Sequence, residues 1–263
     1  MKLVTWNINS VRLRLPLLQR LIAEQQPDVI CLQETKCADE FFPDEDLRAA
    51  GYTHQAIWGQ KSYNGVAILS RQPLSDIQTH TRVGKNDCRH ISARLPNGTE
   101  IHNAYIPAGG YEPDPIINPK FQHKLDFVDE LAAWWTQRNK EQKKSAKILV
   151  GDLNIAPLEH DVWDSKKMHN TVSHTAAERT RFTAMQDSIG WVDAVRHFHP
   201  PDQKLYTWWT YRQPDWEGVN KGRRLDHIWV TPDLVSGMKS AHVIKSMRGV
   251  EQPSDHIPVI LEF

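Results

Sequence analysis

The sequence contains few cysteines, no excess of charge of either sign and no long hydrophobic run. Its three cysteines, Cys31, Cys37 and Cys88, are odd in number and form no C-x-x-C pair, so we expect neither a disulfide framework nor a zinc site. They are expected to be buried apolar side chains in a reducing compartment. Because 32 basic residues balance 32 acidic residues, the chain is unlike proteins that bind nucleic acid through bulk positive charge.

No stretch is apolar for long enough to be a signal peptide or to cross a bilayer, and the N-terminal run is interrupted after a few residues. Repeats of fixed period and low-complexity tracts are also absent. These absences predict a cytoplasmic enzyme with no membrane attachment. At 263 residues the chain suits one large domain or two small ones.

Short β-branched and apolar runs predict a protein rich in strands. Eight runs have the length and composition of strands, namely residues 2–6, 29–32, 65–70, 90–95, 101–106, 148–150, 225–230 and 259–263. Apolar stripes at helical spacing predict two amphipathic helices, one from Leu17 to Ile22 and one from Phe121 to Trp135. The basic stretch 138–147 is expected to be a surface loop. Together these elements indicate a layered α+β fold with more than one sheet.

Unusual polar side chains stand at or near the ends of the predicted strands. They are Asn7, Asn9, Glu34, Asp152, Asn154, Asp226, Asp255 and His256. Singly, each is explained at least as well by a turn, a helix cap or a solvated surface. As a set they supply what phosphodiester hydrolysis needs: oxygen ligands for Mg²⁺, a carboxylate that activates water, and a donor for the charge that grows on the phosphate. An aspartate–histidine pair suits the last role, because the carboxylate orients the ring and favours its protonated form.

Three segments in a fixed order carry a more specific signal: Leu-Gln-Glu-Thr-Lys at 32–36, Gly-Asp-Leu-Asn at 151–154 and Ser-Asp-His at 254–256. With Thr-Trp-Asn-Ile-Asn at 5–9, they make the chain similar to the exonuclease III family of abasic-site (AP) endonucleases, within the endonuclease/exonuclease/phosphatase superfamily. The similarity spans nearly the whole chain. It implies one catalytic domain over residues 1–263 and a four-layer αββα sandwich, in which two mixed β-sheets are flanked by helices.

The resemblance also implies a metal site for Mg²⁺, with Mn²⁺ as a possible substitute. Glu34 would be the principal ligand, and Asn7 and Asp255 would complete or support the site. Asp152 would be either the general base for the attacking water or a second ligand. The full set of candidate ligands is Asn7, Glu34, Asp152, Asn154, Asp255 and His256.

The remaining implied roles concern the phosphate. Asn154 would position it, and His256, oriented by Asp226, would stabilise its charge. Tyr105 would lie beside the phosphate as a donor or as a phenolate, although its spacing suits a buried strand residue equally well.

The implied activities are AP endonuclease, 3′-phosphodiesterase or phosphatase and 3′–5′ exodeoxyribonuclease, performed by a monomer on duplex DNA with abasic sites or with blocked or recessed 3′ ends. Two other classes stay open, a superfamily hydrolase of another phosphate ester and a non-catalytic binding module. Against the first, deoxyribonuclease I relatives carry histidine at the position of Tyr105. Against the second, no charged residue of the predicted site is missing.

Two segments depart from the family pattern. Trp208 is the expected apolar wall of the abasic pocket, but Arg223 stands where the family commonly has tryptophan, which predicts a more polar or partly blocked pocket. In Thr-Val-Ser-His-Thr at 171–175, where the family reads Asn-x-Gly-Phe-Thr, bulky His174 is expected to replace glycine. It is then either a surface histidine in a tolerant loop or a side chain that narrows the pocket. A narrowed pocket predicts mainly 3′-end exonuclease activity with weak AP endonuclease activity. Asn9 is assigned to DNA or pocket contact, and a further set of candidate phosphate contacts is Arg12, Lys36, Arg71, Lys120, Lys221, Arg224 and Arg248.

Overall fold

Two β-sheets pack face to face in the structure, a computed structural model that describes residues 1–141 and 145–263. Across these residues each sheet has six strands. The first sheet has the order β11, β12, β1, β2, β4, β3, with bounds Ser240–Val243, Val259–Glu262, Lys2–Asn7, Val29–Gln33, Val66–Ser70 and His54–Trp58. The second has the order β5, β6, β7, β8, β10, β9, with bounds Ser75–Thr79, His90–Arg94, Glu100–Ala104, Lys147–Asp152, Asp226–Val230 and Val192–Asp193. Both sheets are mixed, because β1 pairs with β2 and β7 with β8 in parallel, whereas the other pairs are antiparallel.

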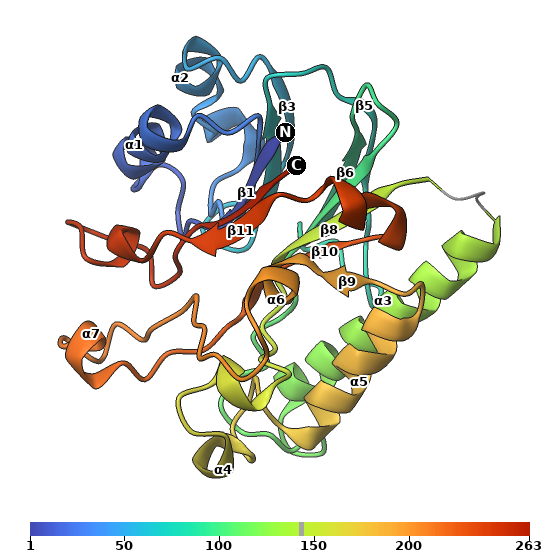
Figure 1. The fold of residues 1–263 in the computed structure, drawn as a ribbon, viewed down its shortest axis with the longest axis vertical. Coiled ribbons are helices and arrows are strands. Elements are labelled where there is room, and N and C mark those ends of the chain that lie inside the picture. The colour runs from blue at the N-terminus through green and yellow to red at the C-terminus, as the bar shows by residue number, and fades with distance from the viewer. Residues whose placement is uncertain (142–144) are drawn as a thin grey trace.

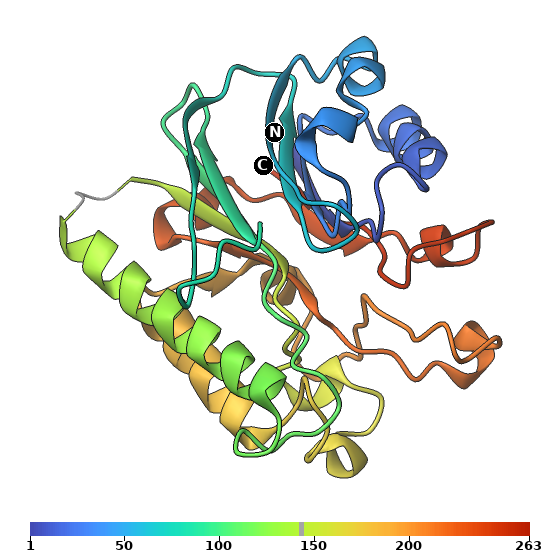
Figure 2. The ribbon, with the colours of Figure 1, turned by 180° about the vertical axis from the view of Figure 1, so that it is seen from behind.

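Helices cover the outer face of each sheet, so the layers follow the order helix, sheet, sheet, helix (Figures 1 and 2). α1 (Leu15–Gln25) and α2 (Asp44–Ala49) lie on the first sheet, and α3 (Pro119–Glu141) and α5 (Ala176–Asp187) lie side by side on the second. The shorter α-helices are α4 (Ser165–Met168), α6 (Ala194–Phe198) and α7 (Trp216–Val219). Short 3₁₀ segments occupy Asp39–Phe41, Glu159–Asp161, Pro232–Gly237 and Lys245–Arg248. The expected four-layer αββα sandwich is confirmed.

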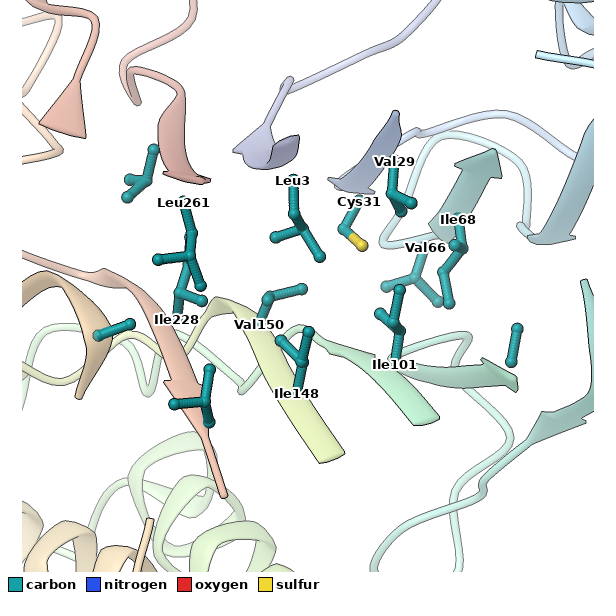
Figure 3. Close-up of a cluster of buried hydrophobic side chains, with 14 of the residues drawn as sticks. Leu3, Val29, Cys31, Val66, Ile68, Ile101, Ile148, Val150, Ile228 and Leu261 are labelled. Carbon is teal, nitrogen blue, oxygen red and sulfur yellow. The ribbon is translucent and has the colours of Figure 1, made fainter. Parts of the chain in front are cut away.

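The central core lies between the two sheets. Figure 3 shows Leu3 of the first sheet above Val150 and Ile148 of the second, with Leu261 above Ile228 in the same way. Because helices bury the opposite faces as well, most central strands are buried on both sides and read as nearly continuous apolar runs. This double burial explains why apolar runs in the sequence located these strands.

All eight runs predicted as strands are strands, with ends shifted by at most two residues. Four strands were not predicted: β3, β5, β9 and β11. β5 is fully exposed and polar at the edge of its sheet, so it carries no apolar signal. The expected loop at 138–147 is partly wrong, because α3 continues to Glu141 and β8 begins at Lys147, while residues 142–144 lie outside the described residues. Within the described part of the chain, every helix is too short or too polar to span a membrane.

Candidate active site

The ends of four central strands place the predicted polar residues at one end of the sandwich. In the second sheet, the antiparallel register of β8 and β10 sets Asp152 directly beside Asp226. In the first, the parallel register of β1 and β2 sets Asn7 beside Gln33, one residue before Glu34. β1 also contacts β8 across the core, so the residues that end these strands meet between the sheets.

Asn7 links carboxylates that come from the two sheets. Its side-chain Nδ2 donates to Oε1 of Glu34 at 2.9 Å and to Oδ2 of Asp152 at 2.8 Å. Its Oδ1 accepts from the backbone N–H of Asn9 at 3.1 Å. The amide nitrogen of Asn7 therefore faces both carboxylates. In this geometry Asn7 orients the candidate metal ligands, while its own oxygen is engaged by the backbone.

Glu34 is held in its charged form. The Nζ of Lys36 lies 2.7 Å from Oε2 of Glu34, and the hydroxyl of Tyr105 donates to Oε1 at 2.8 Å. Burial alone would raise the pKa of Glu34, but the charge of Lys36 and the hydrogen bonds from Asn7, Lys36 and Tyr105 lower the pKa below its ordinary value. Burial and the charge of Glu34 raise the pKa of Tyr105 well above its ordinary value. The hydroxyl of Tyr105 is therefore a donor to Glu34.

His256 lies between two aspartates. Its Nδ1 is 2.8 Å from Oδ2 of Asp226, and its Nε2 is 3.6 Å from Oδ2 of Asp152. Burial favours the neutral ring, but the carboxylates of Asp226 and Asp152 raise the pKa of His256 above its ordinary value. Burial, and then the negative charges of Asp226 and Glu34, raise the pKa of Asp152. The pair Asp226–His256 therefore presents an imidazolium to the site.

Asn154 is tied to the same carboxylate. Its backbone N–H donates to Oδ1 of Asp152 at 3.0 Å, and its Nδ2 donates to Ile106 O at 2.9 Å and to Oδ2 of Asp152 at 3.1 Å. Asp255 lies on the other side of the site, where Asn9 donates to Oδ1 at 3.0 Å and the indole of Trp208 donates to Oδ2 at 3.0 Å. Both oxygens of Asp255 are thus engaged by neighbouring side chains, and Asp255 supports the site from its edge.

Several residues of the site have left-handed backbone conformations that favour glycine. The φ angles are 49° at Asn9, 50° at Glu34, 52° at Lys36, 54° at Asn154 and 88° at Ser173. Such conformations cost on the order of 1–3 kcal/mol each and persist where the surrounding structure imposes them. The rest of the fold therefore offsets this cost. It holds these residues in conformations that differ from ordinary strand geometry and that direct their side chains into one site.

A pocket of about 260 Å³ opens beside this network. It is lined by the polar residues Glu34, Asp152, Asn154 and His256. Val172, Ser173, Trp208, Arg223 and Leu225 line it as well. The two residues predicted for the wall of an abasic pocket, Trp208 and Arg223, are thus both lining residues of this pocket.

The prediction that His174 narrows this pocket is wrong. His174 is fully buried, with Nδ1 2.6 Å from Ala156 O and Nε2 2.8 Å from the hydroxyl of Ser165, and it does not line the pocket. Its neighbour Ser173 lines the pocket instead, with the positive φ that the glycine of the family pattern would adopt. Ser173 is also the third residue of the segment 171–175, so it is the residue that replaces the glycine. Both ring nitrogens of His174 therefore have hydrogen-bond partners in the protein interior, behind the pocket wall.

The structure shows what surrounds two of the basic residues that were predicted to contact DNA. Arg224 is fully buried and pairs with Asp161 and Asp193 at 2.6 and 2.7 Å, so it contacts no DNA phosphate. Arg12 is exposed and lies over the ring of Phe41 at 5.9 Å, outside the pocket lining.

Two buried residues that hold the site in place, Thr207 and Ser254, were not predicted. The hydroxyl of Thr207 accepts from the backbone N–H groups of Leu225 and Asp226 at 3.0 and 3.1 Å. The hydroxyl of Ser254 donates to Asn7 O at 2.7 Å and accepts from the backbone N–H of His256 at 3.2 Å. Ser254 belongs to the segment Ser-Asp-His at 254–256, so the sequence already indicated that it lies near the site. The sequence around Thr207 gave no such indication, because the role of Thr207 depends on a strand that is distant in sequence.

The donor set fits a hard divalent cation. Atoms of Asp152, Asp226 and His256 lie within 4.8 Å of one another, and Oδ1 of Asp226 is buried without a hydrogen-bond partner among the described residues. The raised pKa of His256 favours the imidazolium, whose nitrogens carry no free lone pair, so the oxygen atoms of the carboxylates are the better donors. Carboxylate and amide oxygens are the ligands that Mg²⁺ prefers.

Comparison with known proteins places this geometry in a family. The model of the Endonuclease/Exonuclease/phosphatase family matches residues 4–256. An exodeoxyribonuclease III from Haemophilus influenzae is 33% identical over 100% of both chains. An AP endonuclease from Archaeoglobus fulgidus is 31% identical with a TM-score of 0.92, covering 100% of this chain and 99% of that one. A 3′ phosphatase from Neisseria, solved with a product DNA hairpin, is 34% identical with a TM-score of 0.91 and the same coverage. The chain therefore belongs to the Endonuclease/Exonuclease/phosphatase family and, within it, to the exodeoxyribonuclease III and AP endonuclease group.

Proposed function

We propose that this chain is a Mg²⁺-dependent DNA-repair nuclease that hydrolyses phosphodiester bonds in duplex DNA, at abasic sites and at blocked or recessed 3′ ends. The observation that carries the proposal is the convergence of Glu34, Asp152 and His256: the amide of Asn7 joins Glu34 to Asp152, and Nε2 of His256 lies 3.6 Å from Asp152. A carboxylate pair and an imidazolium at this spacing suit hydrolysis of a phosphate ester. The names of the relatives, an exodeoxyribonuclease, an AP endonuclease and a 3′ phosphatase, support DNA as the substrate.

Glu34 is the proposed principal metal ligand. Its carboxylate is ionised, lines the pocket and already attracts a cation, the ammonium of Lys36. Asp152 and Asn154 line the same pocket as Glu34, and their side-chain oxygens would complete or adjust the site. A bound Mg²⁺, or Mn²⁺ in its place, would neutralise charge on the phosphate oxygens and polarise the scissile bond.

Asp152 is the proposed general base. Hydrogen bonds from Asn7 and Asn154 fix its carboxylate, and its raised pKa brings its basicity closer to that needed to take a proton from water. Nε2 of His256 lies 3.6 Å from Asp152, beyond hydrogen-bond distance, so its proton is available to a phosphate oxygen placed between them. Asp226 keeps the ring charged and oriented. Tyr105, as a phenol, donates beside the phosphate.

A groove next to Tyr105 gives the DNA a path to the site. It encloses about 680 Å³ and is lined in part by Lys85, Arg89, Lys120 and Tyr111. Tyr111 is 86% exposed, so its ring is free to contact a ligand. A local basic and aromatic groove supplies phosphate contacts and stacking without any net charge on the chain.

The proposal extends to the organisation of the protein. Both sheets contribute to one site, so we assign residues 1–263 to a single catalytic domain. All site residues come from one chain, which suits a monomer. The buried thiols of Cys31, Cys37 and Cys88 suit a reducing cytoplasm.

Turnover of labelled duplexes tests the proposal. Duplexes with a recessed 3′ end, a 3′ phosphate or an internal abasic analogue would be incubated with Mg²⁺ and then with EDTA, beside an inositol phosphate as a substrate of another class. We expect hydrolysis of the DNA substrates with Mg²⁺ alone. Glu34→Ala should abolish metal-supported turnover, and Asp152→Asn should abolish turnover while DNA binding by fluorescence anisotropy persists. A near-normal rate for Asp152→Asn would remove Asp152 from the role of base.

A further inference from the structure

Arg223 joins the two walls of the pocket. Its guanidinium carbon lies 5.0 Å over the ring of Trp208 on one wall. Its Nη1 donates to Val172 O at 3.1 Å and to the hydroxyl of Ser173 at 3.0 Å on the other wall. The backbone of Arg223 is fixed as well, because its N–H donates to Trp208 O at 3.0 Å. The side chain is thus a built part of the pocket and not a flexible surface group.

The charge of Arg223 has no carboxylate partner. Among the described residues, no carboxylate oxygen lies within 4 Å of its nitrogens. The acidic group that acts on it electrostatically is Glu178, which already accepts from Lys124 and from the backbone N–H groups of Ser173 and Thr175. Burial lowers the pKa of Arg223, as expected for a cation that lacks a close anion.

The carboxylates and the cation line one pocket. Glu34 and Asp152 line it together with Arg223, Trp208 and Ser173. Among the described residues, Nε and Nη2 of Arg223 have no hydrogen-bond partner, which leaves two donor nitrogens of the planar guanidinium for a ligand. A group attached to a phosphate held at Glu34 and Asp152 would share this pocket with Arg223.

We propose that Arg223, with Trp208 and Ser173, forms an anion subsite that recognises a small carboxylate or phosphoryl group attached to the scissile phosphate at a DNA 3′ end. This inference rests on the proposed function and specifies part of its substrate. An unpartnered guanidinium binds a carboxylate through two parallel hydrogen bonds, whereas a neutral group would leave the buried charge unpaired. The subsite therefore distinguishes damaged ends by charge.

Two duplexes that differ in one functional group test the subsite. In both, the 3′-terminal phosphate is esterified, with glycolic acid in one duplex and with glycolamide in the other, so that shape is conserved and charge is not. Binding is measured in EDTA by fluorescence anisotropy, and kcat/KM is measured with Mg²⁺. We expect the wild type to prefer the acid by roughly tenfold in both measurements, as for a hydrogen bond to a charged group. Arg223→Gln should bring the ratio to about one, and Arg223→Lys should keep part of the preference because it keeps the charge.

Arg20→Gln is the matched control, because Arg20 is exposed on α1, contacts Glu24 rather than the pocket, and its loss changes the net charge equally. The acid-to-amide ratio should be the same in Arg20→Gln and in the wild type. Equal ratios in the wild type and Arg223→Gln would overturn the subsite, as would an equal loss of preference in Arg20→Gln. Thermal unfolding of each variant confirms that the chain is folded. If no DNA is hydrolysed with Mg²⁺, the proposed function fails, while the binding ratio in EDTA still decides the subsite.

Discussion

Nδ1 of His256 lies 2.8 Å from Oδ2 of Asp226, and the opposite nitrogen of the ring faces Asp152. The buried carboxylate of Asp226 thereby fixes both the orientation and the charge of the imidazole, in a site where a phosphate oxygen would receive its proton. The two ring nitrogens therefore have different functions. Nδ1 is bound to Asp226, which orients the ring, and Nε2 is available to donate a proton.

Asp226→Asn should therefore impair catalysis more than folding. The amide removes the charge that keeps His256 protonated, so the pKa of His256 should fall and turnover should drop by about 100-fold or more. Proton NMR of His256 in the metal-free protein reports the pKa, and kcat at saturating Mg²⁺ reports the catalytic loss. Asp193→Asn, which removes a buried carboxylate from the ion pair with Arg224, is the control for loss of a structural carboxylate. An unchanged titration of His256 in Asp226→Asn would contradict this account.

Changes at Ser173 and His174 should have different effects. Ser173→Gly relaxes a φ of 88°, so it should be about 1 kcal/mol more stable than Ser173→Ala, which loses the hydroxyl but keeps the Cβ. His174→Gly should lose two buried hydrogen bonds and roughly 2 kcal/mol or more of stability. It should not raise incision at an internal abasic analogue relative to 3′-end hydrolysis. Denaturant unfolding and the ratio of the two rates check these outcomes, and a selective gain of internal incision in His174→Gly would restore the pocket role of His174.

The buried pair of Lys124 and Glu178 should contribute to stability and to the shape of the site. Both side chains are fully buried, and Nζ of Lys124 also donates to Asn154 O at 2.7 Å. Lys124→Met should lower the free energy of unfolding by about 3–5 kcal/mol, because it leaves Glu178 buried without its cation. Glu178→Gln in the same chain should recover part of this loss. Urea unfolding of the two single variants and the double variant measures the coupling, and strictly additive losses would show that the pair does not act as a unit.

A cluster of three histidines at the second sheet, His80, His90 and His102, should make the protein less stable in mild acid. Burial lowers the pKa of His80 to about 3 and that of His102 to about 4, below the ordinary value of 6.5. The unfolded chain then binds more protons than the folded chain between pH 6.5 and 4, so stability falls as the pH falls through this window. For fully buried His102 the loss between pH 7.5 and pH 5 should be about 2 kcal/mol.

Urea unfolding at these two pH values measures the loss. His102→Gln should reduce it, whereas His169→Gln, which removes an exposed histidine, should leave it unchanged. Equal pH dependence in the wild type and His102→Gln would contradict the assignment.

Much of the fold could be predicted because its central strands are buried on both faces and leave an unbroken apolar signal, as in β2 and β8. Edge strands such as β5 carry no such signal, because one of their faces or both contact water. The candidate site could be predicted from three ordered segments around Glu34, Asp152 and His256. Their convergence, however, depends on a sheet register that a linear sequence does not display.

The prediction failed where the direction of a side chain mattered. Adjacent residues in an irregular loop point to opposite sides, so a shift of one position exchanged the wall residue Ser173 for buried His174. Arg224 was taken for a surface charge because its partners Asp161 and Asp193 are 63 and 31 residues away along the chain. In both cases long-range packing decides which side chain meets solvent.

The single amide of Asn7 bridges groups that belong to opposite halves of the molecule, with Glu34 in one and Asp152 in the other. Neither sheet by itself carries all the residues of the candidate site. A chimaera that takes one sheet from a distant relative would therefore lack nuclease activity unless the spacing between the two sheets were preserved to a fraction of an ångström.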